Sequence, residues 1–472
     1  ETSVTVHQQG PNGALSPIVR QTPLADNMPG WSFCAGDLNN DGFTDMMYGG
    51  GGGTTFMLSD ANGVGFTEIS PPQFIFCQRT NLVDLNNDGD LDAFSCHDID
   101  ANVYFLNDGA GSLNYHQGGL GPTCGNYGSI WTDYDNDGDQ DLFIAKCGCD
   151  PHDVFMRNDG DLNFTSVAGQ FGFEDEGGSW SSPWGDFDND GDMDVLASTG
   201  DPTYHNKLMR NDGNGFTNVL VGSGLEGYNG YSIEWTTFDL DNDGYLDVIC
   251  GGSGFLMGHG DMTFTPFPSS LYGAVGDANN DGFLDILNGS RVMLNQGNDN
   301  HWLTVSTVGT VSNANGIGAR VRITSAMGTQ IRDVRSGEGF RYMHSLNTHF
   351  GLGADSVITE LTIEWPSGLV NTLHDVPADQ PIVVVEGVST SVQEEAEAAT
   401  LDPYPSPAEN TLFVRNGDKL GNRPMSILDA SGKLVFRGTL RNGTVDVTGL
   451  SGGLYLLRVE GEEVMQARFV KR

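Results

Sequence analysis

Short apolar runs recur through the first 300 residues, and polar or glycine-containing turns separate them. Short runs without helical periodicity are typical of strands in an all-β protein. Six of the runs directly follow a nine-residue acidic stretch, and in several units the next apolar run ends at an Asn-Asp-Gly turn. The predicted strands after the acidic stretches are residues 46–48, 93–95, 142–145, 195–197, 248–250 and 286–287.

The units follow one another at intervals of 38 to 53 residues. Four antiparallel strands in a unit of this length are typical of one β-propeller blade. The sixth unit, from about residue 271 to 298, has room for only three strands. Residues 1–30 read as two short strands around a turn at 11–13, and they could complete that blade. We therefore predict a six-bladed propeller over residues 1–299, with seven blades as the alternative.

The acidic stretch follows the pattern Asp-x-Asp/Asn-x-Asp-Gly-x-x-Asp, and it occurs six times. Oxygens at positions 1, 3 and 5 of such a loop converge, and a carbonyl at position 7 and a carboxylate at position 9 complete an all-oxygen shell that suits Ca²⁺. Glycine at position 6 permits the positive φ that turns the chain around the ion. We expect about six structural Ca²⁺ ions. The expected ligands are Asp37, Asn39, Asp41, Phe43 and Asp45; Asp84, Asn86, Asp88, Asp90 and Asp92; Asp133, Asp135, Asp137, Asp139 and Asp141; Asp186, Asp188, Asp190, Asp192 and Asp194; Asp239, Asp241, Asp243, Tyr245 and Asp247; and Asp277, Asn279, Asp281, Phe283 and Asp285.

Two other interpretations of the acidic stretch fit less well. An EF-hand needs a twelve-residue loop that ends in Glu and lies between helices. Here the ninth residue is Asp, and a strand-like run follows it. Simple Asp-Gly turns need one or two such residues, whereas these loops share five positions. Calcium therefore remains the expectation.

The acidic loops and their blades resemble the FG-GAP/VCBS repeats of integrin α-subunit propellers and bacterial surface proteins. The resemblance implies that each loop joins the first two strands of a blade and holds calcium. Residues 300–388 contain His301-Trp-Leu-Thr-Val305, His349-Phe-Gly-Leu-Gly353 and Glu364-Trp-Pro-Ser-Gly368. These signatures resemble the ASPIC/UnbV domain of proteins similar to cartilage acidic protein, and alternating strands such as residues 320–324 predict a small β domain.

The last part of the chain differs in composition from the rest. Residues 389–401 are polar, acidic and without aromatics, which is typical of a flexible linker. Residues 402–472 carry Tyr404-Pro-Ser-Pro-Ala408 and Leu450-Ser-Gly-Gly-Leu-Tyr-Leu-Leu-Arg458, which resemble signatures of the C-terminal sorting domain of type IX secretion substrates. The resemblance implies a β-sandwich, recognition by the type IX machinery, and export across the outer membrane of a Bacteroidota-type cell.

Charge and length narrow the class of function. The chain has 472 residues and a formal net charge of −41, which disfavours binding to nucleic acid or to anionic membrane surfaces. The sequence has no run of eighteen apolar residues, so no membrane span is expected. The chain opens at Glu1 without an apolar signal segment, and we expect a mature form of an exported protein.

Seven cysteines fit an exported protein. Cys77 and Cys96 flank one acidic loop, and Cys124 and Cys147 flank the next. Equivalent places on the two arms of a hairpin predict the disulfides Cys77–Cys96 and Cys124–Cys147. The remaining set is Cys34, Cys149 and Cys250, which is odd, so at least one thiol is expected to be free or paired between chains.

No catalytic or cofactor-binding residue is singled out, because the common catalytic motifs are missing from the sequence. Trp131 and Trp184, each two residues before a loop, are expected to pack inside blades. The preferred function is a secreted or cell-surface calcium-binding adhesion or recognition protein with a glycan or protein ligand. The alternative is a secreted polysaccharide lyase or hydrolase on the propeller face, built from loop histidines such as His97, His152 and His205. A deep pocket lined by two or more His, Asp, Glu or Arg side chains would favour the enzyme, and a plugged channel would favour binding.

Overall fold

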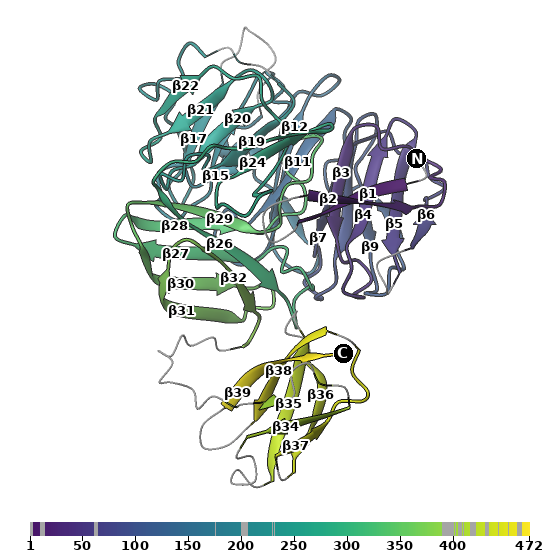
Figure 1. Cartoon of the computed structure of the whole chain (residues 1–472). Helices are drawn as coiled ribbons and strands as arrows, with labels where there is room; N and C mark the ends of the chain where they lie inside the picture. The colour runs from purple at the N-terminus through teal and green to yellow at the C-terminus, as the bar shows by residue number, and fades with distance from the viewer. Residues whose placement is uncertain are drawn as a thin grey trace. The chain divides into compact units, whose positions relative to one another are not determined.

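The computed structural model of the chain is almost entirely β-structure (Figure 1). It forms two compact units, residues 1–391 and 392–472. The expected turn at 11–13, His205 and most of the expected linker, residues 389–400, lie outside the described residues. The described residues are 3–9, 15–60, 65–174, 176–199, 206–228, 230, 232–388, 401, 403–404, 408, 410–415, 422–429, 434–441, 443–451, 453–459 and 465–472.

Six consecutive sheets in the first unit are built around the acidic loops, as expected for propeller blades. In each sheet the loop joins the first and second strands, which pair in antiparallel register. The first two sheets comprise β3 (Ser32–Gly36), β4 (Asp45–Gly50), β5 (Gly53–Ser59) and β6 (Phe66–Ile69), then β7 (Cys77–Val83), β8 (Asp92–His97), β9 (Val103–Leu106) and β10 (Asn114–Gln117).

The third, fourth and fifth sheets repeat this order, and α1 (Ala168–Phe171), the only helix among the described residues, follows the last strand of the third sheet. Their second strands begin at the last aspartate of each loop, as the apolar pattern predicted. The strands are β11 (Asn126–Thr132), β12 (Asp141–Lys146), β13 (Val154–Asn158) and β14 (Phe164–Ser166); β15 (Trp184–Gly185), β16 (Asp194–Ala197), β17 (Lys207–Asn211) and β18 (Phe216–Asn218); and β19 (Trp235–Phe238), β20 (Asp247–Cys250), β21 (Phe255–Gly258) and β22 (Phe264–Phe267).

The sixth sheet keeps only three strands, β23 (Ala274–Gly276), β24 (Asp285–Asn288) and β25 (Arg291–Met293). The expectation that residues 1–30 would complete it is wrong. β1 (Ser3–Gln9) and β2 (Leu15–Gln21) pair with each other from Ser3↔Gln21 to Gln9↔Leu15 and form a separate two-stranded sheet. Each strand thereby satisfies backbone groups of the other along its whole length.

Residues 301–388 form the expected small β domain, with two sheets. It shares its core with the blades: Leu303, Val305 and Phe350 pack in one buried cluster with Phe56 and Phe105. The domain is therefore part of the first unit. Its strands are β26 (His301–Val308), β29 (Thr348–Gly353) and β32 (Gln380–Val385) in one sheet, and β27 (Arg320–Ser325), β28 (Gly328–Asp333), β30 (Val357–Glu364) and β31 (Val370–Pro377) in the other.

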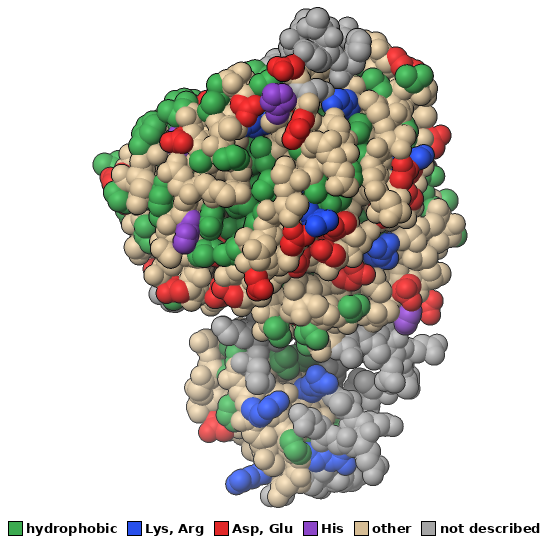
Figure 2. Space-filling model, turned by 180° about the vertical axis from the view of Figure 1, so that it is seen from behind, with side chains coloured by type: hydrophobic (Ala, Val, Ile, Leu, Met, Phe, Trp, Pro, Cys, Tyr) green, Lys and Arg blue, Asp and Glu red, His purple; other side chains and the backbone are tan. Residues whose placement is uncertain are grey.

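The second unit has the seven short strands of the expected sandwich, with a core of its own that includes Leu412, Ile427, Leu457 and Phe469. On the face shown in Figure 2, Lys and Arg side chains stand out among the described residues of this unit, whereas Asp and Glu outnumber them on the first unit. The two sheets are β33 (Pro403–Tyr404), β34 (Thr411–Val414) and β37 (Thr444–Asp446), and β36 (Leu434–Leu440), β35 (Arg423–Asp429), β38 (Gly453–Val459) and β39 (Met465–Lys471).

Both predicted disulfides are wrong, and a different pair is bonded. Cys77 stands opposite His97 because a bulge shifts the register of β7 against β8. Its side chain packs in a different core cluster from that of Cys96, so the two thiols lie on opposite faces of the sheet. Cys147 is likewise a free thiol, so the second predicted pair is not formed either.

The bonded pair is Cys124–Cys149, with Cα atoms 6.1 Å apart. The N–H of Cys147 donates to the carbonyl of Gly125 at 2.9 Å, which places Cys124 one residue further out on the hairpin. The sulfur of Cys149 is therefore the one within reach. The other five cysteines, Cys34, Cys77, Cys96, Cys147 and Cys250, are free and buried.

Candidate metal centre

Each acidic loop is shaped by its own first aspartate. In the loop that starts at Asp133, the N–H groups of Asp137 and Gly138 each donate to a carboxylate oxygen of Asp133 at 3.1 Å. Asn136 and Gly138 have φ angles of 60° and 97°, a region that Asn and Gly tolerate best. The bond from the position 6 N–H to the position 1 carboxylate is present in all six loops.

The ninth residue begins the second strand and turns its carboxylate back to the loop. Asp141 accepts hydrogen bonds from the N–H groups of Tyr134 at 3.0 Å and Asn158 at 2.7 Å. In every loop the position 2 N–H donates to the position 9 carboxylate. The loop is thus closed by side-chain bonds at both ends before any ligand is considered.

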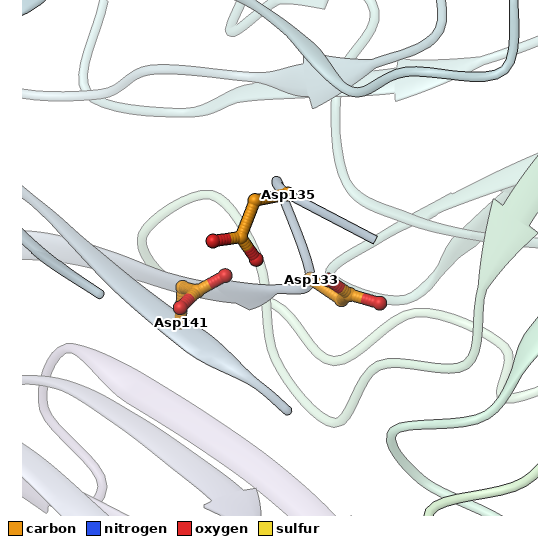
Figure 3. Close-up of side chains that lie close together, drawn as sticks. All are labelled: Asp133, Asp135 and Asp141. Atoms are coloured by element: carbon orange, nitrogen blue, oxygen red, sulfur yellow. The ribbon is translucent and has the colours of Figure 1, made fainter. Parts of the chain in front are cut away.

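In three loops the carboxylates at positions 1, 3 and 9 converge. One oxygen from each residue lies within 4.8 Å of the other two, a spacing that could hold a metal ion. Figure 3 shows the group formed by Asp133, Asp135 and Asp141. The first and last residues of each group are buried and the middle one is half-buried. The other two groups are Asp186, Asp188 and Asp194, and Asp239, Asp241 and Asp247.

Burial disfavours the ionised form of these carboxylates. Burial and the negative charge of Asp135 and Asp133 outweigh the hydrogen bonds from Asn158 and Tyr134, so the pKa of Asp141 is raised to about 9. Burial likewise raises the pKa of Asp186 and of Asp239 to about 7. A cation between the three oxygens would favour the ionised forms, because an opposite charge lowers a carboxyl pKa.

The converging groups also contain oxygens that the protein leaves without a partner. Oδ1 of Asp135, Asp188 and Asp239 is buried and accepts no hydrogen bond from any described residue. Buried acceptors are normally satisfied, because an unmet one costs about 1–3 kcal/mol. Each group therefore offers at least one free carboxylate oxygen beside two others, which fits a hard cation.

The other three loops have asparagine at position 3. In two of them its amide donates to the position 5 carboxylate: Asn86 to Asp88 at 2.8 Å and Asn279 to Asp281 at 2.7 Å. In the first loop the amide of Asn39 donates to the carbonyl of Ser59 at 3.3 Å. These loops thus place fewer charges at the same point.

The expected ligands at positions 5 and 7 lie outside the three converging groups. The position 5 carboxylate accepts the N–H of position 7 in all six loops, as Asp137 does from Asp139 at 3.0 Å. It is not a member of the three converging groups. Ligation by positions 5 and 7 therefore stays a prediction.

Sequence reasoning missed the asparagine at position 4, although all six loops contain it. Its amide reaches the next loop, so each loop is bonded to its neighbour. In three pairs the acceptor is the position 7 carboxylate, and in two it is the position 6 carbonyl. The bonds run from Asn40 to Asp90 (2.8 Å), Asn87 to Asp139 (2.6 Å), Asn136 to Asp192 (2.6 Å), Asn189 to Gly244 (3.1 Å) and Asn242 to Gly282 (2.9 Å).

The small β domain lies against the same loops, which the sequence did not indicate. Asn315 accepts a hydrogen bond from the N–H of Asp37 at 2.7 Å. Arg320 donates to the carbonyl of Asp133 at 2.5 Å and pairs with Asp333 at 2.8 Å. His349 shares a hydrogen bond with Asn242 at 2.7 Å. The conformation of the acidic loops and the position of the β domain therefore depend on each other.

The segment after β28 runs between the blades. Arg79, which is fully buried, donates to the carbonyls of Phe340 and Tyr342 at 3.1 and 3.0 Å. Glu234 accepts the N–H groups of Phe340 and Arg341 at 3.0 and 2.7 Å. Residues 340–342 are thereby bonded both to the sheet that begins with β7 and to Glu234, directly before β19.

The histidines that follow the loops do not gather. His97 is 2% exposed and lies against Phe74, His152 bonds Asp150 at 3.0 Å, and His259 bonds Thr265 at 2.8 Å. These three described histidines thus have separate local partners.

The two tryptophans that precede loops pack inside blades, as expected. Trp131 is 4% exposed and contacts Phe94, and Trp184 is 1% exposed and contacts Phe143. They are not a surface platform for sugars.

Comparisons with known proteins divide the chain into three parts. The model of the FG-GAP-like repeat matches residues 84–144, 133–197 and 186–250. The model described as ASPIC and UnbV matches residues 309–391, and that of the secretion system C-terminal sorting domain matches residues 403–472. A search of the curated proteins gave no match.

The solved structures that match the chain are remote. The biofilm matrix protein Bap1 of V. cholerae is 12% identical, with a TM-score of 0.33; the match covers 95% of this chain and 68% of that one. PorZ, a surface component of the type IX secretion system of Porphyromonas gingivalis, is 11% identical with a TM-score of 0.18, over 100% of this chain and 85% of that one.

No described helix has the length and apolarity that a membrane crossing requires. The C-terminal sorting domain indicates export across the outer membrane, to the cell surface or the medium. The chain therefore combines FG-GAP-like repeats, an ASPIC and UnbV domain and a type IX C-terminal sorting domain in one exported, nearly all-β protein.

Proposed function

We propose that the chain is an exported recognition protein whose acidic loops hold structural Ca²⁺ ions. The observation that carries this proposal is the convergence of three buried or half-buried carboxylates in each of three loops. The loops that start at Asp133, Asp186 and Asp239 are the strongest sites, and the three with asparagine at position 3 are weaker sites of the same kind.

Calcium suits these sites better than zinc or copper. The converging ligands are all carboxylates, and neither His nor Cys belongs to the three groups. Hard oxygen donors favour Ca²⁺ or Mg²⁺, whereas softer metals favour nitrogen and sulfur. Ca²⁺ also accepts the irregular, many-ligand shells that a short loop with carbonyls provides.

The ion is proposed to act on the whole loop array. It would offset the repulsion among the carboxylates of each group and so fix the conformation of that loop. The hydrogen bonds of the position 4 asparagines would then restrain the next loop. The hydrogen bonds of Arg320 and His349 to two of the loops would restrain the ASPIC and UnbV domain in the same way. A rigid array of this kind would hold its outer loops in fixed positions for recognition of a glycan or protein.

Chelation tests the metal assignment. Transfer from millimolar Ca²⁺ to EDTA is expected to lower the melting temperature strongly, because each occupied site adds about 2.7 kcal/mol at 100 times its dissociation constant. Asp188→Asn should lower the calcium content and reduce this shift, whereas exposed Asp299→Asn should do neither. Calcium-free protein at millimolar Ca²⁺, measured by elemental analysis, would refute the assignment.

Recognition needs its own experiment. A glycan array probed with calcium-loaded protein is expected to give binding that EDTA abolishes. Reducing-end or unsaturated-product assays on the same polysaccharides are expected to show no turnover. Turnover that survives purification would instead establish the polysaccharide-degrading alternative.

A further inference from the structure

A cavity of about 80 Å³ lies where the fourth, fifth and sixth sheets meet the segment between β28 and β29. A water-sized site needs roughly 10–15 Å³ of such volume, so this cavity accommodates about six non-hydrogen atoms. Ser345 and Asn347 line it and are exposed, so it opens to the surface there. It is separate from the converging loop oxygens except where Asp239 forms part of its wall.

Four residues that line the cavity each carry a buried polar atom that the protein does not use. Nε1 of Trp184, Oγ1 of Thr237, Nε of Arg335 and Nε2 of His344 each lack a hydrogen-bond partner among the described residues. All four residues line the cavity. Unmet buried polar atoms are rare, and four of them around one cavity indicate a ligand that accepts hydrogen bonds.

The hydrogen bond that His344 accepts defines which of its ring nitrogens carries the proton. The N–H of Val275 donates to Nδ1 of His344 at 3.1 Å, so that nitrogen is an acceptor. Burial, together with the positive charge of Arg79, lowers the pKa of His344 to about 3, so the ring is neutral near pH 7. Its one proton is therefore on Nε2, the partnerless nitrogen, which makes it a donor.

The charges of the wall are unevenly balanced. Asp333 is paired with Arg320 at 2.8 Å and with Arg335 at 3.2 Å, and Glu338 pairs with Arg335 at 3.3 Å. Arg332 instead donates to two neutral acceptors, the carbonyl of Ile331 at 2.8 Å and Oε1 of Gln330 at 3.2 Å. Among the described residues it has no carboxylate within 4.0 Å.

We propose that this cavity binds a small carboxylate of up to about six non-hydrogen atoms. Its oxygens would accept from the hydroxyl of Thr237 and the unused N–H donors, and its charge would balance Arg332. The charge argument rests on the proposed function, because an ion at Asp239 would remove the nearby negative charge that otherwise compensates Arg332. The donor argument does not depend on the metal.

Calorimetric titration of the full calcium-loaded chain with lactate, pyruvate and glycolate tests the proposal. At least one acid is expected to bind saturably and raise the melting temperature, while the matching neutral amide, such as lactamide, does not. Thr237→Val removes a single hydroxyl at nearly constant shape and should weaken binding by roughly tenfold, the value of about one hydrogen bond.

Thr54→Val is the matched control, because Oγ1 of Thr54 is also buried without a partner but lies in the first sheet, away from the cavity. It should leave the affinity unchanged. Trp184→Phe, which keeps an aromatic ring but removes the indole N–H, provides a second variant if Thr237→Val unfolds. Calcium-loaded protein that binds no acid, binds the amide equally well, or binds equally after both cavity substitutions overturns the proposal. Protein without calcium refutes the proposed function instead.

Discussion

Glycine at position 6 of the acidic loops meets two separate requirements. The first is the positive φ, which is 92° at Gly89 and 97° at Gly138. The second applies only where the ASPIC and UnbV domain comes close: a Cβ on Gly89 would lie 2.6 Å from the carbonyl oxygen of Val311, whereas one on Gly138 would meet nothing within 4 Å. The need for a positive φ is evident from the sequence pattern, whereas the close contact with Val311 is evident only from the structure.

Alanine at these two positions separates the requirements. Gly138→Ala is expected to lower the free energy of unfolding by about 1–2 kcal/mol, because the only penalty is the strain of a Cβ in the left-handed conformation. Gly89→Ala should cost about 1–3 kcal/mol more, because backbone atoms of two domains must move apart. Urea denaturation in millimolar Ca²⁺ measures both variants, with Gly42→Ala as a second control at φ 87° without a neighbour. Equal losses at Gly89 and Gly138 would contradict the docking role.

At the scale of the element, a carboxylate holds one loop of the ASPIC and UnbV domain in place. Glu386, directly after β32, is 2% exposed and accepts the N–H groups of Thr310, Val311 and Ser312 at 2.7, 2.7 and 2.9 Å. Burial disfavours its charge, but these bonds and the hydroxyls of Ser367 and Ser312 outweigh it and lower the pKa to about 2. The loop that it holds leads to Asn315, which bonds the first acidic loop.

The lowered pKa predicts a pH dependence of stability. The folded carboxyl titrates near 2 and the unfolded one near 4.3, so its contribution is complete above about pH 5 and is lost as the pH falls towards 2. The contribution is on the order of 2–3 kcal/mol. Stability curves of the wild type and Glu386→Gln should therefore converge as the pH falls from 5 to 2. Parallel curves over that range would show that Glu386 does not titrate this way.

The hairpins show which features of an element can be predicted from neighbouring residues and which cannot. The strands after each loop were predicted, because aspartate followed by an apolar run is readable from the residues alone. The disulfides were not, because a bulge between Cys77 and Thr80 shifts the register of β7 and turns Cys77 to the face opposite Cys96. A bulge of this kind depends on neighbouring sheets, since one residue of slip exchanges the two faces.

At the scale of the whole molecule, the two units have separate cores. The core of the second unit draws all its residues from positions 401–469. The core of the ASPIC and UnbV domain instead includes blade residues such as Phe56 and Phe105. The domain boundary expected at residue 300 is therefore a change of sequence family within one folded unit.

These cores predict how the chain unfolds. Removing residues 402–472 is expected to leave the calcium content and the main melting transition of the remaining chain unchanged, and to delete a smaller, calcium-independent transition. Removing residues 300–472 should instead expose the shared core and prevent folding of the blades. Scanning calorimetry of the three chains checks this. A blade fragment that melts like the full chain would show that the shared core contributes little.

The sequence by itself determined the all-β class, the loop-centred repeat, the loop residues and the sorting domain, because these depend on spacing along a few neighbouring residues. Tertiary structure decided which strands complete which sheet, which cysteines meet, and how Asn and Arg side chains join one loop to the next or to the ASPIC and UnbV domain. It also decided the cavity and its unused donors. Those features join residues far apart in the chain, and their positions follow from packing that no local pattern encodes.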